Sequence, residues 1–289
     1  MSGSAAIGGE LTMNTPFNDS NYVFHLWTSK TDILKHLAEL LRDLLTEGNL
    51  ECTPEGIRIM CLTVDKTSLV HMRLKCKQQT NGDKTTGFEK YTCKETLNLG
   101  LNMEDYFKII KLVEKKETIR YFVTDDNRTE LAIQRINQEE NICNTKYIKL
   151  MDINTKPMAI PDIVFDNVIV MNSVRFQKIC KEIGTFSDLV EIKSIGKTLY
   201  FRAHKANVKQ EIMIKPTNTD TGMEFEVCKN TSDIIVGVYK LKYLESFSKC
   251  ANFSPTVKIF LQNDTPLIIE CEISDLGLIR LCISNMVTE

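Results

Sequence analysis

The chain has 289 residues, 43% of them hydrophobic and 26% charged, which is typical of an ordinary globular protein of about two domains. Its formal net charge of −2 argues against a protein that coats nucleic acid with a uniformly basic surface, although positive charge can still be gathered on one face. The sequence lacks the run of about 18 apolar residues that a membrane-spanning helix needs.

The first 21 residues are rich in Gly, Ser and Asn, without the basic start and apolar core of a secretion signal, so we predict a flexible leader over residues 1–21. The ten cysteines are scattered, with no C-x-x-C pair and no Cys/His cluster. In a chain without a secretion signal, such cysteines are expected to be reduced and mostly buried. We therefore expect an intracellular protein.

The first half begins with an alternating strand at Tyr22–Thr28. The clearest helix of the chain follows over residues 29–48, with Ser29 or Thr31 as its cap and Gly48 as its end. Further strands are predicted in order along the chain at 50–52, 57–62, 68–75, 88–99, 118–123, 129–135 and 143–150. A polar loop at 76–87 and a second helix at 102–116, capped by Asn102, interrupt them.

Residues 150–166 form a segment that fits no regular element. Pro157 and Pro161 remove backbone donors and disfavour helix before them, yet the segment is rich in apolar residues. An apolar segment of this kind either lies extended over an apolar surface or presents its own apolar side chains to a partner. We predict an extended connector.

After the connector the order of elements repeats. A strand at 167–170 and a helix at 173–186 precede five strands, a helix at 239–252 and three closing strands. The offset between the two copies is roughly 140 residues, longer than the period of a solenoid. The sequence therefore predicts a duplicated domain, with one copy at 22–149, the connector at 150–166 and the other copy at 167–289.

No pattern in the sequence indicates an enzyme. The phosphate-binding, dinucleotide-binding, serine-hydrolase and zinc-protease motifs are all missing. The four histidines lie in different predicted elements: His25, His36, His71 and His204. Asp125-Asp126-Asn127 is better explained as a hairpin turn than as a metal loop. We predict no catalytic residue, no cofactor and no metal.

The predicted helices carry the informative pattern. Each of the four places two or more Lys or Arg residues away from its apolar stripe: Lys35 and Arg42; Lys108, Lys111 and Lys115; Lys178 and Lys181; Lys242 and Lys249. One continuous sheet with all helices on one side would gather these residues on one surface. Such a surface suits contact with the phosphate backbone of duplex DNA without base readout, so we predict these residues as DNA-binding.

Collinear stretches from about Tyr22 to the chain end resemble the eukaryotic-type DNA sliding clamps, the proliferating cell nuclear antigen family. The most specific are DILKHLAELLRDLLTE, GIRIMCLTVDKTSLVHMRL, LGLNMEDYFKIIK, YIKLMDINTKPMAIP and NDTPLIIECEISDLG. The resemblance implies an α+β fold of two tandem DNA-clamp domains, with sheets outside and helices lining a ring. It also implies a non-enzymatic polymerase processivity factor that assembles head to tail as a homotrimer. By the resemblance, the residues that line the hole and contact DNA are Lys35, His36, Arg42, Lys108, Lys111, Lys178, Lys181, Lys242 and Lys249.

The resemblance also assigns residues to two protein interfaces. A partner pocket under the connector would use Leu62, Lys66, Thr67, Leu69, Met158, Ile160, Pro161, Phe165, Pro266, Cys282, Ile283 and Ser284. Its clients would insert a short helical turn with one aliphatic and two aromatic anchors. The trimer interface would pair strand 141–149 with strand 207–215 of the next subunit, through Cys143, Thr145, Tyr147, Asn207, Ile212 and Ile214.

The chain departs from the family pattern at several positions. Thr63 replaces an acidic residue, Lys66 replaces a histidine found in many members, and Asn285 replaces a proline of the tail. Gly196 stands where the family has a modified lysine, and the 76–87 loop is about ten residues longer than usual. This divergence is expected of a viral or protist member.

The implied partners are duplex DNA, DNA polymerase and other clients, a clamp loader and further copies of the chain, with no membrane. The implied location is the nucleus or a viral replication compartment. One alternative is a clamp-like accessory subunit that acts as a monomer or within a heterotrimer, which weak pairing between the two edge strands would indicate. The other is a nuclease with a scattered carboxylate site, which metal-dependent DNA cleavage would indicate.

Overall fold

The computed structural model describes residues 21–76, 78–79, 85–154, 163–205, 207–217, 222–229 and 232–286. The first half contains β1 (Tyr22–Thr28), α1 (Thr31–Leu44), β2 (Glu47–Thr53), β3 (Gly56–Leu62), β4 (Ser68–Lys75), β5 (Gln78–Gln79), β6 (Thr85–Thr86), β7 (Lys90–Cys93), β8 (Leu97–Asn102), α2 (Met103–Ile110), β9 (Thr118–Thr124), β10 (Glu130–Asn137) and β11 (Ile142–Lys149).

The second half contains β12 (Asn167–Asn172), α3 (Ser173–Gly184), β13 (Leu189–Ile195), β14 (Thr198–Lys205), β15 (Val208–Ile214), β16 (Met223–Cys228), β17 (Ile234–Lys240), α4 (Leu241–Phe247), the 3₁₀ helix η2 (Ser248–Asn252), β18 (Thr256–Leu261), β19 (Leu267–Ile273) and β20 (Gly277–Ile283). Its strands and helices follow the order of the first half. The α+β tandem fold expected from the sequence is therefore confirmed.

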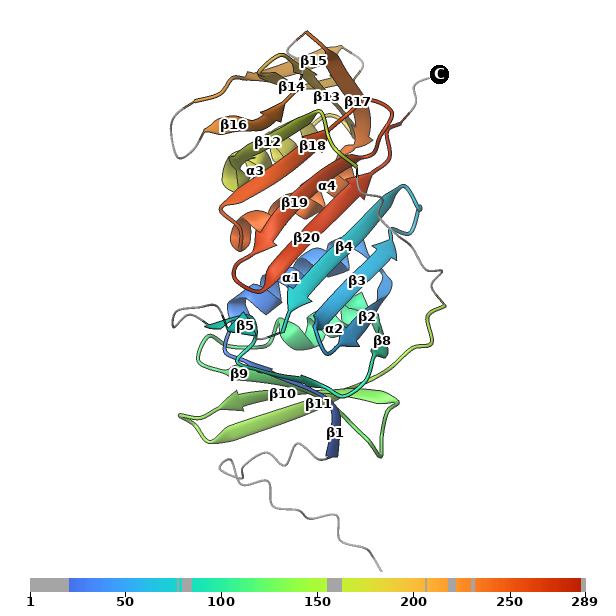
Figure 1. The fold of residues 1–289 in the computed structure, drawn as a ribbon, viewed down its shortest axis with the longest axis vertical. Coiled ribbons are helices and arrows are strands. Elements are labelled where there is room, and N and C mark those ends of the chain that lie inside the picture. The colour runs from blue at the N-terminus through green and yellow to red at the C-terminus, as the bar shows by residue number, and fades with distance from the viewer. Residues whose placement is uncertain are drawn as a thin grey trace, which may run out of the picture.

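A nine-stranded sheet crosses from one half to the other. Its order is β16-β12-β18-β19-β20-β4-β3-β2-β8, and the halves join where β20 pairs antiparallel with β4, from Gly277 opposite Leu74 to Ile283 opposite Ser68 (Figure 1). A five-stranded sheet, β11-β10-β9-β1-β7, completes the first half, and a four-stranded sheet, β15-β14-β13-β17, completes the second.

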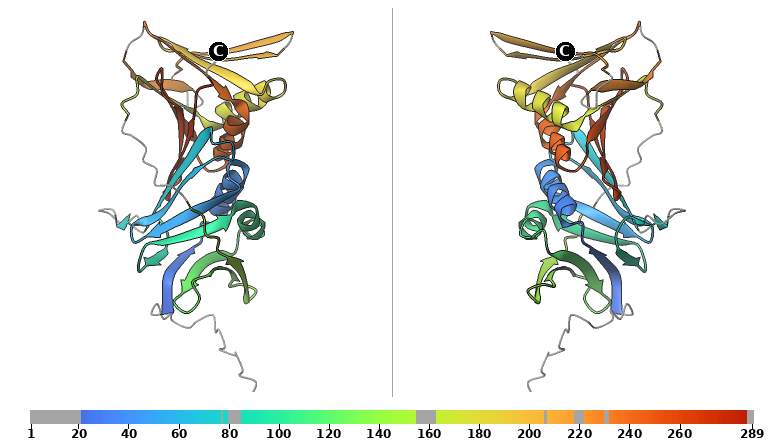
Figure 2. Two further views of the ribbon diagram at one scale, coloured as in Figure 1. Left: turned by 90° about the vertical axis from the view of Figure 1, so that its right-hand side faces the viewer. Right: turned by 90° about the vertical axis from the view of Figure 1, so that its left-hand side faces the viewer.

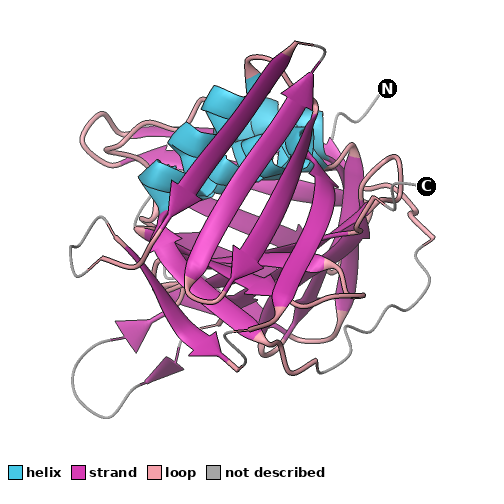
Figure 3. Cartoon of the chain, turned by 90° about the horizontal axis from the view of Figure 1, so that it is seen from above, coloured by secondary structure: helices cyan, strands magenta, loops and turns pink. Residues whose placement is uncertain are grey.

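The helices all lie on one side of these sheets. Figure 2 shows them stacked along one side of the molecule, and in the view along the long axis they form a single group beside the strands (Figure 3). Each buries an apolar face in the core; Leu40 of α1, Ile110 of α2, Phe176 of α3 and Phe247 of α4 are all fully buried. Burial of such side chains contributes about 1.5–3 kcal/mol each, so the apolar faces fix which side of each helix turns outward.

Several predicted helix ends were wrong. Helix α1 ends at Leu44, and Gly48 lies in β2, where a Cβ would stand 3.1 Å from Met103 Cε. Neither predicted cap of α1 acts as one, because its N-cap position is Lys30 and the Ser29 hydroxyl donates to Glu89 instead. The Asn102 cap of α2 is confirmed, since its side chain accepts a hydrogen bond from the backbone N–H of Asp105.

The predicted helices at 102–116 and 239–252 are also shorter than expected. Helix α2 ends at Ile110, so Lys111 is its C-cap residue. The predicted helix at 239–252 is α-helical only to Phe247 and continues as the tighter 3₁₀ turn η2. Ser248 and Cys250 of η2 are buried, so this turn packs against the core.

Candidate functional sites

The predicted DNA-binding residues lie on the helical side of the molecule, but they differ in exposure. Five of them are exposed to solvent: Lys108, Lys111, Lys178, Lys181 and Lys242. The other four are half-buried: Lys35, His36, Arg42 and Lys249. Arg175, one turn before Lys178 on α3, is also half-buried and was not chosen from the sequence, although its spacing of three residues could have shown it.

Two of the half-buried cations are held by carboxylates of α1. The Nζ atom of Lys249, on η2, lies 2.8 Å from Glu39 Oε1 and 2.5 Å from Asp43 Oδ2. The Arg42 guanidinium lies 2.6 Å from the Asp43 carboxylate and stacks over the Phe107 ring at 4.1 Å. This cluster joins the second half to the first and offsets much of the positive charge at the middle of the helical side.

Other predicted cations have partners as well. Lys108 lies 3.2 Å from Asp105 within α2, and Lys242 lies 3.2 Å from Asp65 in the β3–β4 turn. Lys35 donates to the Val113 carbonyl at 3.0 Å. Within the described residues, Lys111, Lys178 and Lys181 have no carboxylate at ion-pair distance. These three lysines therefore present uncompensated positive charge.

A cavity of about 200 Å³ opens where the two halves join, and it coincides with much of the predicted partner pocket. Seven predicted residues line it: Leu62, Lys66, Thr67, Leu69, Pro266, Cys282 and Ser284. Ser68, Ile163 and Ile268 also line it and were not chosen from the sequence. Leu62 is exposed, so the cavity offers an apolar contact to a ligand.

The other predicted pocket residues are placed differently. Ile283 turns its side chain into the core, where it is buried. The Phe165 ring packs against Phe260, with ring centroids 5.4 Å apart. Phe260 pairs across the strands with Ile268, a lining residue, so Phe165 lies beside the cavity rather than in it. Met158, Ile160 and Pro161 lie outside the described residues.

Two departures from the family pattern have structural roles at this site. Thr63 is buried, and its hydroxyl lies 3.2 Å from the Ser68 carbonyl and 3.0 Å from Asp65 Oδ1, which closes the turn between β3 and β4. Asn285 accepts a hydrogen bond from the Val238 backbone N–H at 2.9 Å, so the tail covers the edge of β17. Burial raises the pKa of the Cys282 thiol at the cavity wall to about 11, which keeps it protonated at neutral pH.

The two strands predicted to pair between subunits are both open edges. β11 borders the five-stranded sheet and β15 the four-stranded sheet, and they lie at opposite ends of the molecule (Figure 1). Cys143, Tyr147 and Asn207 are exposed, whereas Thr145 and Ile212 are half-buried. Ile214 is buried in the core, so only its backbone faces outward.

Exposed apolar residues mark these two edges. Ile142 and Tyr147 on β11 are 50% and 61% exposed, and Val208 and Met213 on β15 are 51% and 53% exposed. Ile142, Val208 and Met213 were not chosen from the sequence. Their apolar type at a strand edge is a signal that could have identified them, because proteins rarely leave such edges bare.

No group of three or more His, Cys, Asp or Glu side chains in the described part of the chain is arranged to hold a metal ion. No helix there has the length and apolar character that crossing a bilayer requires.

Comparison with known proteins identifies the family. Residues 23–157 match the N-terminal domain, and residues 159–286 the C-terminal domain, of proliferating cell nuclear antigen. The chain is 30% identical over 273 residues to a probable DNA polymerase sliding clamp of Paramecium bursaria Chlorella virus 1, covering 94% of this chain and 100% of that protein. It is 26% identical over 249 residues to proliferating cell nuclear antigen of Dictyostelium discoideum, covering 86% and 93% of the two chains. The chain therefore belongs to the proliferating cell nuclear antigen family of DNA sliding clamps.

Proposed function

We propose that this DNA sliding clamp, a processivity factor for DNA polymerase, works as a closed homotrimeric ring around duplex DNA. The observation that carries the proposal is the continuous nine-stranded sheet, with the α-helices of the described residues all on one side and an open strand edge at each end of the molecule. A head-to-tail contact that closes on itself makes a ring, and it also covers both edges.

In this proposal the protein catalyses nothing and acts by topology. The ring prevents the clamp from leaving the DNA, while uncompensated lysines on the helical side contact phosphates without reading bases. A polymerase held at the partner pocket rebinds the primer end at high effective concentration after each dissociation. A clamp loader would open and close the ring, and the work would take place in the nucleus or in a viral replication compartment.

The ring closes through pairing of β11 with β15 of the next subunit, in this proposal. Light scattering at several concentrations should give a stable species of three times the chain mass. Replacing Tyr147 with Lys should shift the mass toward the monomer, because it puts an extra charge beside Lys146 and Lys149 at the edge. Val236→Lys, at another exposed apolar residue, on β17, serves as control. A monomer at every concentration would favour the open or heterotrimeric accessory subunit instead.

The cavity at the junction of the two halves holds the client motif, in this proposal, together with Met158 and Ile160 of the connector. Client binding can be measured as the fluorescence anisotropy of a labelled peptide with one aliphatic and two aromatic anchors. Leu62→Asp, and separately M158A/I160A, should weaken binding by at least about tenfold, since a charge or a lost anchor costs more than 1.4 kcal/mol. The trimer mass should not change. Unaltered peptide binding by both variants would contradict the pocket assignment.

A further inference from the structure

The outer face of the nine-stranded sheet, opposite the helices, carries three arginines on neighbouring strands. Arg58 on β3 lies directly opposite Arg73 on β4. Arg280 on β20 lies opposite His71, two residues before Arg73 and therefore on the same face. Cross-strand neighbours have Cβ atoms about 4.5–5.5 Å apart, and like charges placed opposite each other are destabilising. We call Arg58, Arg73 and Arg280 the arginine cluster.

His71 lies at the centre of the arginine cluster. Its side chain is only 4% exposed, and neither ring nitrogen has a hydrogen-bond partner among the residues that the structure describes. Burial, followed by the nearby charges of Arg73, Arg280 and Arg58, lowers its pKa to about 4. The imidazole is therefore neutral at physiological pH and adds no positive charge to the arginine cluster.

Carboxylates compensate only part of the charge of this region. Glu51 lies 3.3 Å from Arg58, and Glu270 lies 2.5 Å from Arg280. Arg73 and Lys75, both exposed, have no carboxylate at ion-pair distance among the residues the structure describes. The region around Arg73 thus keeps an excess of positive charge.

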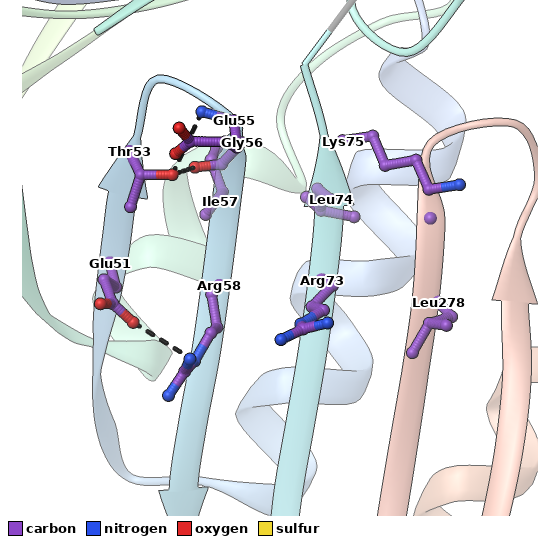
Figure 4. Close-up of a pocket in the computed structure, with 11 residues that line it drawn as sticks. Glu51, Thr53, Glu55, Gly56, Ile57, Arg58, Arg73, Leu74, Lys75 and Leu278 are labelled. Carbon is purple, nitrogen blue, oxygen red and sulfur yellow. Dashed lines mark hydrogen bonds and ion pairs between the residues drawn. The ribbon is translucent and has the colours of Figure 1, made fainter. Parts of the chain in front are cut away.

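A groove of about 480 Å³ runs beside Arg73 across β2, β3, β4 and β20 (Figure 4). Arg58 and Arg73 extend from adjacent strands along it, Leu278 lies on its far side, and Lys75 lies near its end (Figure 4). At this end Gly56 has a φ of 149°, and a Cβ there would stand 2.0 Å from the Leu74 carbonyl oxygen. The glycine therefore permits the close approach of β3 and β4 beneath the groove.

The charge pattern around the groove selects the type of ligand. Glu270 and Glu272 share the outer face on β19, as their pairing with Arg280 and Leu278 shows, and Glu51 and Glu55 border the other side. A nucleic acid strand, with a phosphate at every residue, would meet carboxylates on both sides of the cluster. A peptide with its negative charge concentrated at one place would not.

We propose that this groove binds a short acidic segment of a partner protein and holds its carboxylate or phosphate groups between Arg73 and Arg58, which line it. Guanidinium groups suit these oxyanions because they donate paired hydrogen bonds. The groove lies on the face away from the helices, so a clamp on DNA can bind such a segment. It is also separate from the cavity at the junction of the two halves, with which it shares no lining residue.

The test uses fluorescence anisotropy of three short labelled peptides that differ only at a central run: glutamate, phosphoserine or glutamine. The full-length protein should bind the glutamate and phosphoserine peptides but not the glutamine peptide. Arg73→Gln should weaken binding by at least about tenfold, the loss expected for a charge-assisted pair. Lys193→Gln, a substitution on β13 of the four-stranded sheet, should leave it unchanged. The tighter of the two acidic peptides identifies which oxyanion the groove prefers.

Three results would overturn the proposal. One is equal binding by the Arg73→Gln variant and the unaltered protein, with both shown to be folded by circular dichroism. Another is an equal loss in the Lys193→Gln variant, which would indicate general electrostatic attraction. The third is labelled single-stranded DNA that binds more tightly than either acidic peptide in a manner that depends on Arg73, because the ligand would then be nucleic acid.

Discussion

The two halves of the clamp repeat one architecture but present different charge on their helices. In the first half, Arg42 is paired with Asp43, and Lys108 is paired with Asp105. In the second half, Lys178 and Lys181 of α3 are exposed, with no carboxylate at ion-pair distance among the described residues. Lys111 of the first half also has no such carboxylate, and Lys242 and Lys249 of the second half are paired. The contrast is therefore between α3 and the pair Arg42 and Lys108, because a paired cation has much of its charge offset.

The largest expected effect of this difference is on α3. The double variant Lys178→Glu/Lys181→Glu should weaken duplex DNA binding more strongly than the matched Arg42→Glu/Lys108→Glu variant. It should also reduce the slope of log affinity against log salt by about 2, since each lost phosphate contact removes about 0.9. Both quantities can be measured by anisotropy of a labelled duplex over a range of salt concentrations. Equal losses in the two double variants would contradict the proposed asymmetry.

Single substitutions in the first half sharpen the comparison. Lys111→Gln should weaken duplex binding more than Lys108→Gln, because Lys108 is already engaged by Asp105 and Glu104. The expected difference is a few-fold, about 0.5–1 kcal/mol for one exposed charge. The same labelled duplex at low salt measures it. A larger loss for Lys108→Gln would mean that DNA displaces its carboxylate partners.

The contact between the halves through Lys249 should be visible as stability. Lys249→Ala removes ion pairs with Glu39 and Asp43, and we expect a loss of about 1 kcal/mol in the free energy of unfolding. Urea unfolding with a double-mutant cycle against Glu39→Ala isolates the pair. Lys258→Ala, whose pair with Glu226 lies within the second half, is the control. A coupling energy of zero would show that the ion pair does not stabilise the junction.

The smallest expected effect concerns Asp65, which contacts Lys240 and Lys242 across the same junction. Partial desolvation raises its pKa, but hydrogen bonds from Lys240, Tyr243 and Thr67 outweigh this and hold the pKa well below its ordinary value of 3.8. Because the pKa of Asp65 is lower in the folded than in the unfolded protein, its ionised carboxylate stabilises the fold at pH values above the ordinary pKa. This contribution is lost as the pH falls toward the lowered pKa of the folded state. The stability difference between the protein and Asp65→Asn should therefore be constant near neutral pH and shrink below about pH 4. A difference that grows on acidification would contradict this assignment.

Much of the fold and part of the pocket followed from the sequence. The leucine stripe of α1 and the repeated order of elements predicted the tandem domains and placed the helices. Collinear motifs also brought Leu62 and Pro266 to the same cavity, although they belong to different halves. The helices and the element order are local patterns that hydrophobic periodicity reports, whereas the pocket residues came from the resemblance to the sliding-clamp family.

The tertiary structure decided which charged side chains are paired and which residues come together on each surface. Lys249 and Glu39 are 210 residues apart in sequence, and no spacing rule shows that they meet. The arginine cluster depends on the register of β20 against β4, which joins strands from the two halves. The sequence by itself determined which side of each helix is apolar, since burial dominates the free energy of folding. Only packing determined which lysines have carboxylate partners, because that depends on contacts between segments distant in sequence.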